Sequence, residues 1–158
     1  MELILWRHAE AEDGADDLAR ALTPKGRRQA HKMAHWIKGQ LGQFAGTVRI
    51  LSSPAVRTRQ TADALGMPYE LVQQIAPDAT ADDLLAATGW PDSHNLVILV
   101  GHNCAISELA ARLAGAEAST VSLRRGAAWW YASKIHSEGA ARQLTLKSVM
   151  TPSLLAAE

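Results

Sequence analysis

The chain has one cysteine, few aromatic residues and no excess of charge of either sign. Its single cysteine, Cys104, excludes an internal disulfide and cannot by itself build a structural zinc site, which agrees with a reducing compartment. Sixteen Lys and Arg residues balance sixteen Asp and Glu residues. The whole-molecule charge therefore gives no general attraction to nucleic acid or anionic lipid, and any anion site must be local.

Long hydrophobic runs are also missing. The apolar run at the N-terminus, Leu3 to Trp6, is much shorter than the core of a signal peptide and has no basic segment before it. No later run approaches the length of a membrane span. We therefore expect a cytoplasmic protein without membrane or nucleic-acid partners. With 158 residues, of which 47% are hydrophobic, the chain suits one globular domain over residues 1–158.

Short apolar runs alternate with longer amphipathic segments. The runs ELILW, VRILSS and NLVILVG each predict a buried strand. The first amphipathic segment predicts a helix, since Thr23 can cap it, Pro24 suits its first position and Gly42 ends it. Three further helices are predicted, after Ser53, after Thr80 and over residues 105–113. This alternation is typical of an α/β fold with a parallel sheet and crossover helices.

The C-terminal part of the chain has a different pattern. Two runs, AAWWYAS and QLTLKSV, predict strands joined by the turn-rich stretch KIHSEGAAR. Strands joined in this way pair antiparallel, so the sheet is expected to gain an antiparallel hairpin or edge. The last residues, 150–158, are expected to form a loose tail.

Basic side chains follow three of the predicted strands at the point where each ends. Arg7 and His8 follow the first strand. Arg57 lies one turn into the helix after the second strand, and His102 follows the NLVILVG strand. Ligands of open α/β sheets bind beyond the carboxyl ends of parallel strands, so these side chains are expected to meet in one cleft. Two arginines and two histidines suit a phosphoryl group, whose transfer requires fixed positive donors around its equatorial oxygens.

Three sequence blocks at these strand ends, RHA, SSPAVRTRQTA and VGHN, resemble the histidine phosphatase superfamily and, within it, the small SixA-type phosphohistidine phosphatases. The resemblance covers residues 1–149 and implies the phosphoglycerate mutase-like fold, a single-domain three-layer α/β sandwich with helices on both faces of a mostly parallel sheet. It implies that His8 is the nucleophile that becomes transiently phosphorylated. It also implies that Arg7, Arg57 and His102 form the phosphate pocket, with no metal and no cofactor.

The stretch DDLARALTPKGRRQA resembles the segment that follows the nucleophile in SixA-type proteins. There Arg20 is expected to face the cleft as a phosphate or substrate contact, and Asp17 is a further candidate on the same loop. The chain departs from the family pattern at Ala9, where glycine is usual. The methyl group is a small change if the backbone angle is ordinary, but it is costly if the position needs a positive φ. We expect a small adjustment of the pocket floor and retained activity.

The expected chemistry requires a defined protonation state of both His8 and His102. His8 must attack as a neutral ring, so its other nitrogen is expected to donate to a fixed acceptor such as a backbone carbonyl. His102 is expected to be protonated when phosphate is bound. These two expectations can be compared directly with the geometry of the site.

The leaving group decides whether a strong general acid is needed. An alkoxide leaves badly without a proton, whereas the imidazole of a phosphohistidine leaves readily. Superfamily members that cleave esters place a carboxylate after the second block, but no acid here lies in a convincing motif. The candidates are Asp17, Glu70, Asp78, Asp82 and Asp83. The missing acid favours a phosphoramidate substrate, and a chain too short for an inserted lid favours an open cleft and a protein substrate.

The sequence therefore predicts a phosphohistidine protein phosphatase whose partner is a phosphorylated protein such as a histidine-containing phosphotransfer domain. One alternative is a small-molecule phosphomonoester phosphatase of the same fold, acting on a phosphorylated metabolite. Another is a non-catalytic phosphate-recognising module, for which Ala9 is the sequence support.

Several polar residues have simpler interpretations. Arg59 is expected to be a helix-surface charge. His31 and His35 have metal-ligand spacing without an evident third ligand, so they are taken as surface residues. Cys104 is expected to be a small buried side chain. The basic residues near the start of the first helix are expected to form a solvated turn, with steering of a phosphorylated partner as the alternative. They are Lys25, Arg27 and Arg28.

Overall fold

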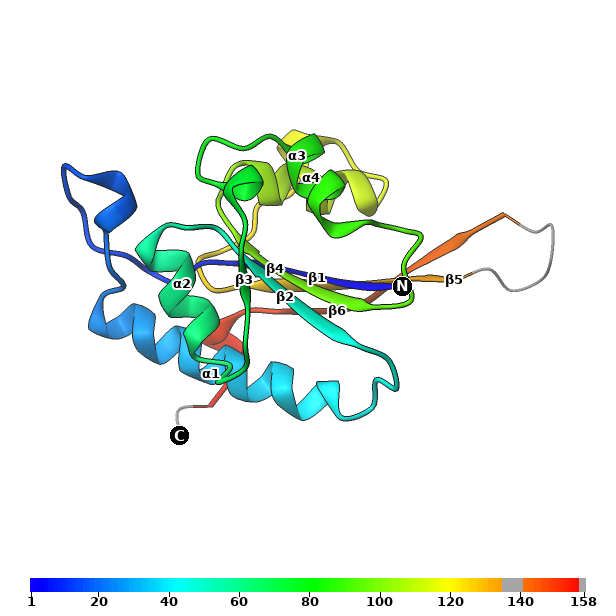
Figure 1. Cartoon of the computed structure of the whole chain (residues 1–158), viewed down its shortest axis with the longest axis horizontal. Coiled ribbons are helices and arrows are strands. Elements are labelled where there is room, and N and C mark those ends of the chain that lie inside the picture. The colour runs from blue at the N-terminus through cyan, green and yellow to red at the C-terminus, as the bar shows by residue number, and fades with distance from the viewer. Residues whose placement is uncertain (135–140, 157–158) are drawn as a thin grey trace.

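A computed structural model describes residues 1–134 and 141–156, which form three layers around one mixed sheet (Figure 1). Its strands follow the spatial order β3-β2-β4-β1-β5-β6. They are β1 (Glu2–Arg7), β2 (Val48–Ser52), β3 (Glu70–Leu71), β4 (Leu96–Gly101), β5 (Ala128–Lys134) and β6 (Gln143–Met150). Strands β3, β2, β4 and β1 run parallel, and β5 pairs antiparallel with both β1 and β6. The predicted mostly parallel sheet is confirmed.

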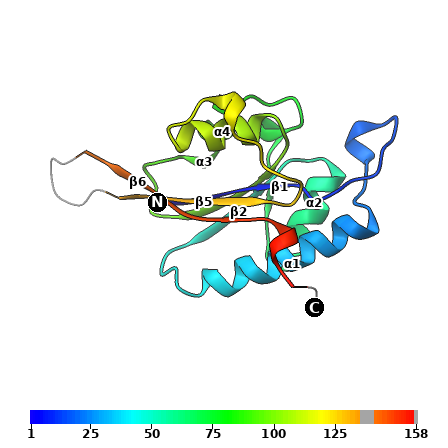
Figure 2. The ribbon, with the colours of Figure 1, turned by 180° about the vertical axis from the view of Figure 1, so that it is seen from behind.

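Helices cover both faces of this sheet (Figures 1 and 2). Helices α1 and α2 lie on one face, and α3 and α4 lie on the other. Their bounds are α1 (Pro24–Leu41), α2 (Val56–Asp63), α3 (Ala81–Thr88) and α4 (Ala105–Leu113). Short 3₁₀ turns are η1 (Asp17–Ala19), η2 (Gln73–Ile75), η3 (Ala118–Thr120) and η4 (Pro152–Leu154). The three-layer α/β sandwich is therefore also confirmed, and none of the described helices is long and apolar enough to cross a membrane.

Strand β4 shows why its sequence is apolar throughout. All six of its residues are buried, with alternate side chains on opposite faces. Ile98 and Val100 pack in the apolar cluster beneath α1 and α2. Val97 and Leu99 pack in the cluster beneath α3 and α4. The central strands thus have no solvated face, and they form a rigid support for the side chains that follow them.

Helix α1 begins as its sequence predicts. The Thr23 side chain accepts a hydrogen bond from the Gly26 backbone N–H at 2.9 Å, and Pro24 occupies the first turn. Gly26 cannot carry a side chain, because a Cβ there would lie 1.9 Å from the Glu10 carbonyl oxygen. This close approach fixes the start of α1 against the segment that follows β1.

The carboxyl ends of the three central strands lie side by side. The His8 backbone N–H donates to the Gly101 carbonyl at 3.1 Å, and the Ser53 N–H donates to the Val100 carbonyl at 3.2 Å. The strand register pairs Arg7 with Gly101. The residues that leave β1, β2 and β4 are therefore held at one edge of the sheet.

The end of the chain differs from the loose tail that the sequence predicts. Pro152 is buried, and Leu155 packs against the apolar cluster beneath α1 and α2. The Lys32 ammonium of α1 donates to the Leu155 carbonyl at 3.3 Å. Gly126 has φ +78° and lies so close to Pro152 that a Cβ would come within 2.9 Å of the proline ring. Residues 151–155 are thus packed in place, whereas much of the predicted hairpin turn lies outside the described residues.

Candidate active site

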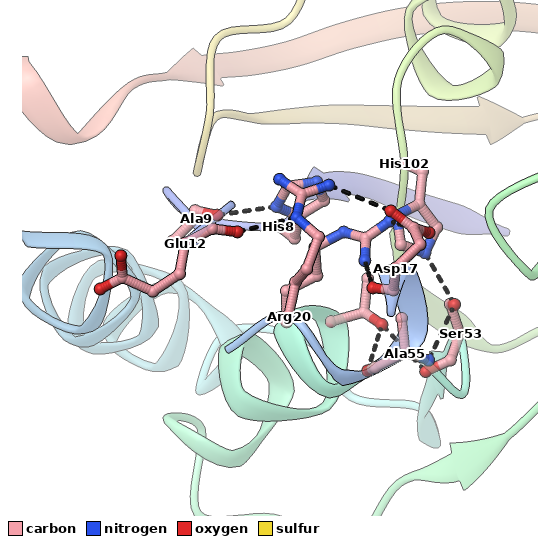
Figure 3. A network of polar contacts seen from close by, with 10 residues as sticks. His8, Ala9, Glu12, Asp17, Arg20, Ser53, Ala55 and His102 are labelled. Atoms are coloured by element: carbon pink, nitrogen blue, oxygen red, sulfur yellow. Dashed lines mark hydrogen bonds and ion pairs between the residues drawn. The ribbon is translucent and has the colours of Figure 1, made fainter. Parts of the chain in front are cut away.

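A pocket of about 220 Å³ opens at the carboxyl ends of β1, β2 and β4. It brings together all four side chains that the sequence places at strand ends, and Arg20 lies beside them. Its lining consists of Arg7, His8, Ala11, Asp13, Arg20, Arg57, Pro77, His102, Asn103 and Arg125. Figure 3 shows the polar network around this pocket.

His8 is held in one tautomer by its own backbone. His8 is 9% exposed, and its Nδ1 lies 2.7 Å from the Ala9 carbonyl oxygen (Figure 3). A carbonyl can only accept, so Nδ1 carries the proton and the lone pair remains on Nε2. Burial, with the nearby Arg57 and Arg7 charges, lowers the pKa of His8 from 6.5 to about 4. The ring is therefore neutral at pH 7, as a nucleophile must be.

Ala9 fits its position without backbone strain. No non-glycine residue in the described ranges has a positive φ, so Ala9 lies outside the left-handed region. Its methyl group is buried in a small cluster with Leu22 and Ala30. Its N–H donates to the Thr61 hydroxyl at 3.1 Å. The side chain therefore adds apolar packing next to His8.

The guanidinium groups of Arg7 and Arg57 flank His8, and each has a nitrogen atom without a hydrogen-bond partner among the described residues. Arg7 donates through one terminal nitrogen to the Leu123 carbonyl at 2.7 Å. The Nε atoms of Arg7 and Arg57 are buried and have no hydrogen-bond partner in the described part of the chain. Burial, followed by the charge of Arg125, lowers the pKa of Arg7. Such cations favour an anion, since an oxyanion would supply both charge and acceptors.

Arg57 enters the site from the buried side of α2. It is 4% exposed and donates to the Asp17 backbone carbonyl at 2.7 Å. Its second terminal nitrogen lies 3.1 Å from the Asp17 carboxylate. Arg59, two residues later, is exposed, as predicted for a helix-surface charge. The position of Arg57 in the pocket is therefore fixed by η1 as well as by its own helix.

The Asp17 carboxylate links two arginines (Figure 3). One oxygen contacts Arg57, and the other lies 3.1 Å from an Arg20 terminal nitrogen. Arg20 also donates through Nε to the Glu12 carbonyl at 2.7 Å, which closes the loop after β1 on itself. The hydrogen bonds from Arg20 and Arg57 lower the pKa of Asp17. Asp17 is therefore ionised at neutral pH, and in this arrangement it is poorly suited to donate a proton to a leaving group.

His102 lies across the pocket from His8, with 5.3 Å between the ring centroids. Its Nε2 lies 2.7 Å from the Ser53 hydroxyl, while its buried Nδ1 has no partner among the described residues. Burial, with the nearby His8 and Arg57, lowers the pKa of His102 to about 3. The ring is thus neutral at pH 7. Protonation of His102 on phosphate binding remains a prediction.

Four residues of the site were not singled out from the sequence. Ser53 orients His102 through its hydroxyl group. Its position in the SSPAVRTRQTA block, at the end of a predicted strand, is the sequence signal that could have identified it. Asn103 lines the pocket and bonds to Ser107. Asp13 and Arg125 line it from loops. Arg125 lies just before β5, far from His8 in sequence, and no local motif marks it.

The remaining candidate acids lie outside the pocket lining. Two of them form ion pairs at the surface, Glu70 with Arg49 and Asp82 with Arg112. Asp83 closes a capping box with Thr80 at the start of α3. Asp78 is exposed and follows Pro77, which lines the pocket. These positions leave Asp13 as the carboxylate that lines the pocket among the described residues.

The prediction for Cys104 is wrong. It is exposed, because it precedes the first turn of α4 as the capping residue and its side chain lies outside the core. His31 and His35 are exposed on α1, as expected. Within residues 1–134 and 141–156, no group of three or more His, Cys, Asp or Glu residues could hold a metal ion.

Comparison with known proteins agrees with this geometry. The family model of the histidine phosphatase superfamily (branch 1) matches residues 3–80, which include the first two of the three sequence blocks. Over these 78 of its 158 residues, the chain is similar to the histidine phosphatase superfamily. The match supports a phosphatase, and the VGHN block that supplies His102 lies beyond the matched segment. No curated protein matches the chain.

Solved structures extend the likeness to nearly the whole chain. A protein from Nakamurella multipartitia assigned as a SixA phosphohistidine phosphatase is 27% identical, with a TM-score of 0.74 over 96% of this chain and 95% of that one. The protein histidine phosphatase SixA complexed with tungstate is 25% identical, with a TM-score of 0.71 over 98% and 99%. A phosphoserine phosphatase mutant from Entamoeba histolytica, in complex with phosphoserine, is 19% identical, with a TM-score of 0.69 over 98% and 99%, and shares the fold.

The lowered pKa values give a first testable prediction. In phosphate-free protein, nitrogen NMR is expected to show both His8 and His102 neutral at pH 5.5, with signals assigned through His8→Ala and His102→Ala. Between pH 6.5 and about 4 the unfolded chain binds more protons than the folded chain, because both rings have lower pKa values when folded. The free energy of unfolding should therefore fall as the pH falls through this window. Titration of both rings near 6.5 would contradict the geometry.

The Asp17 contacts give a second prediction. Asp17→Asn removes a negative charge beside the pocket but keeps the backbone carbonyl that positions Arg57. Inorganic phosphate, measured as a competitive inhibitor, is therefore expected to bind more tightly by about two- to tenfold. Asp16→Asn, on the same exposed loop, is the matched control and should change the inhibition constant little. Weaker phosphate binding in Asp17→Asn would show that the carboxylate's main role is to position the two arginines.

Proposed function

We propose that this protein is a phosphohistidine protein phosphatase that works through a phosphorylated intermediate on His8. The observation that carries the proposal is the hydrogen bond from His8 Nδ1 to the Ala9 carbonyl, in a ring whose lowered pKa keeps it neutral. This arrangement leaves a lone pair on Nε2 within a pocket lined by Arg7, Arg57 and His102. The likeness to SixA proteins supports the same reaction class.

In the first step, His8 Nε2 attacks the phosphorus atom of the substrate. The new P–N bond to His8 forms as the P–N bond to the substrate imidazole breaks, and the departing nitrogen keeps the electron pair of that bond and is protonated by solvent. Arg7 and Arg57 stabilise the equatorial oxygens, where negative charge is spread in the transition state. In the second step, water attacks the phosphohistidine, releases inorganic phosphate and returns the lone pair to Nε2.

His102 contributes differently in the empty and occupied sites. Its pKa is lowered to about 3 when no anion is present. A bound phosphoryl dianion favours the imidazolium form, so His102 can gain a proton as the substrate enters. Its Nδ1 would then carry a hydrogen toward an acceptor, and the hydrogen bond to Ser53 would hold the ring in place. The protonated ring adds a third positive donor to the two arginines.

The acidic residues around this pocket fit a phosphohistidine substrate better than a phosphate ester. An alkoxide needs a proton donor, which contributes roughly 10²- to 10⁴-fold in rate. Asp17 is held ionised between two arginines. Glu70, Asp82 and Asp83 have structural partners at the surface. The substrate imidazole leaves without such a donor.

A small-molecule phosphomonoester phosphatase remains the second candidate. Asp13 lines the pocket and is the feature that favours it, since a carboxylate at the rim could protonate an ester oxygen. The structural neighbour in complex with phosphoserine shares the fold. The non-catalytic alternative loses its support, because Ala9 is not at a positive φ.

Trapping of the phosphoenzyme tests the nucleophile. After brief incubation with a ³²P-labelled phosphohistidine protein and a rapid quench, the wild type is expected to carry an acid-labile, base-stable label, which His8→Ala should lose completely. Arg57→Ala should retain His8 but label about 10²- to 10³-fold more slowly, because a transition-state donor is missing.

Arg59→Ala is the matched control for Arg57→Ala. It removes the same charge from the same helix, but Arg59 is exposed, so labelling should stay within about twofold of wild type. Undiminished labelling of His8→Ala would disprove the assignment of the nucleophile. Equal losses in Arg57→Ala and Arg59→Ala would disprove the proposed pocket.

A substrate panel separates the two candidate functions. The wild type is expected to have a kcat/KM for a phosphohistidine protein at least about 10²-fold above that for phosphoserine, sugar phosphates and nucleotides, because only the esters require a strong acid. Asp13→Asn should leave phosphohistidine turnover within a few-fold. If the esters are turned over faster and Asp13→Asn abolishes that activity, the second candidate is correct.

A further inference from the structure

A second, larger hollow adjoins the active-site pocket and is strongly basic. It has a volume of about 590 Å³ and lies between α1, the residues before β5 and the segment after β6. Figure 2 shows this last segment, in red, lying near α1. Five of the residues that line it are cationic, namely Lys25, Arg28, Lys32, Arg124 and Arg125. We refer to this hollow as the basic groove.

The charge of the basic groove is concentrated and largely uncompensated. Glu10 is the one acidic residue among the described residues that line it. One Glu10 oxygen accepts from the Thr23 hydroxyl at 2.7 Å, and the other lies 3.6 Å from Arg125. The formal charge of the whole chain is zero, so this excess of positive charge is local. The cations come from two separate elements, α1 and the residues before β5. A solvated helix surface would not require the second set, whereas an extended anionic ligand would contact both.

The basic groove leads to the reaction site. Arg125 lines both the groove and the active-site pocket. Glu10, in the groove wall, lies two residues after His8. A chain whose phosphorylated side chain enters the pocket can therefore place its neighbouring residues in the groove. The groove is more than twice the volume of the pocket, which exceeds the needs of a single phosphoryl group.

We propose that the basic groove binds an acidic segment of the phosphorylated protein substrate, next to the residue that is dephosphorylated. This inference rests on the proposed function, because it assigns the same site a protein substrate with Asp and Glu residues near its phosphohistidine. The lining favours a polypeptide over single-stranded nucleic acid, since it has no aromatic residue on which bases could stack among the described residues. Leu154, which follows the lining residue Ser153, is 72% exposed and offers an apolar contact typical of a protein interface.

A charge-neutralising variant tests the groove without touching the pocket. The test variant is Lys25→Gln/Arg28→Gln/Arg124→Gln, and Arg125 is left intact because it also lines the pocket. The matched control removes three exposed cations elsewhere and is Lys38→Gln/Arg59→Gln/Lys134→Gln. The two variants have equal net charge, so a difference between them in binding or turnover depends on where the positive charges were removed. Melting temperatures of both variants check that they fold.

Two readouts are needed. With a phosphorylated histidine phosphotransfer domain carrying Asp and Glu residues beside its phosphohistidine, the test variant is expected to lose about 3- to 30-fold in kcat/KM through KM, with a weaker salt dependence. With N-phosphoimidazole, both variants should match wild type. A fluorescein-labelled oligoglutamate peptide should bind wild type and the control variant about 3- to 30-fold more tightly than the test variant.

The peptide readout distinguishes failure of this proposal from failure of the proposed function. If wild type turns over no phosphohistidine protein yet binds oligoglutamate in the groove, the proposed function is disproved. The groove would then still be a binding site for an acidic ligand, but that ligand would not be a phosphohistidine substrate. If the test and control variants behave alike in both readouts, the groove proposal is disproved. Tighter binding of phosphatidylserine vesicles or single-stranded DNA than of the peptide would also overturn it, in favour of another partner.

Discussion

The chemistry of this site depends on positive charge that is held in a buried position. Arg57 is 4% exposed, and Arg7 and Arg57 each retain a buried nitrogen without a partner among the described residues. Burial of the two rings, with a smaller contribution from these cations, disfavours their protonation, so the pKa of His8 is lowered to about 4 and that of His102 to about 3. At pH 7 only about one His8 ring in a thousand is then protonated. Burial and the cations suited to a phosphoryl group thus both keep His8 in the neutral form that the proposed attack requires.

The sheet makes this arrangement possible. Burying Arg57 beside Arg7 would be unfavourable on a mobile loop, but Arg7 ends β1 and Arg57 lies in the first turn of α2, next to a fully packed set of parallel strands. The hydrogen bonds of His8 and Ser53 to β4 fix the spacing of the three strand ends. Asp17 offsets part of the charge, and because its side chain is 54% exposed it can be displaced at modest cost when an anion enters. The site is therefore preorganised to accept an anion.

Local features were predictable from the sequence, and long-range packing was not. The apolar runs of β1, β2 and β4 and the Thr23 cap of α1 are encoded in adjacent residues, and the strand ends follow from them. Arg125 joins the pocket only because β5 pairs beside β1, which no local pattern specifies. The packing of residues 151–155 depends on Gly126, whose positive φ lets Pro152 approach. The sequence likewise could not show that Cys104 would face outward, since that depends on where α4 begins.

The balance of sixteen basic and sixteen acidic residues proves uninformative about binding, because the charges are separated in space. Arg125 connects the active-site pocket with the basic groove, whereas the acids of α3 and β3 pair with surface arginines elsewhere. A pocket that binds only the phosphoryl group can discriminate little between phosphorylated molecules, since they all present the same oxygen atoms. Selectivity must then come from contacts outside the pocket, and a charged groove beside it acts mainly on encounter and on KM. In the division of roles that we propose, the strand ends determine the reaction and the groove selects the phosphorylated protein.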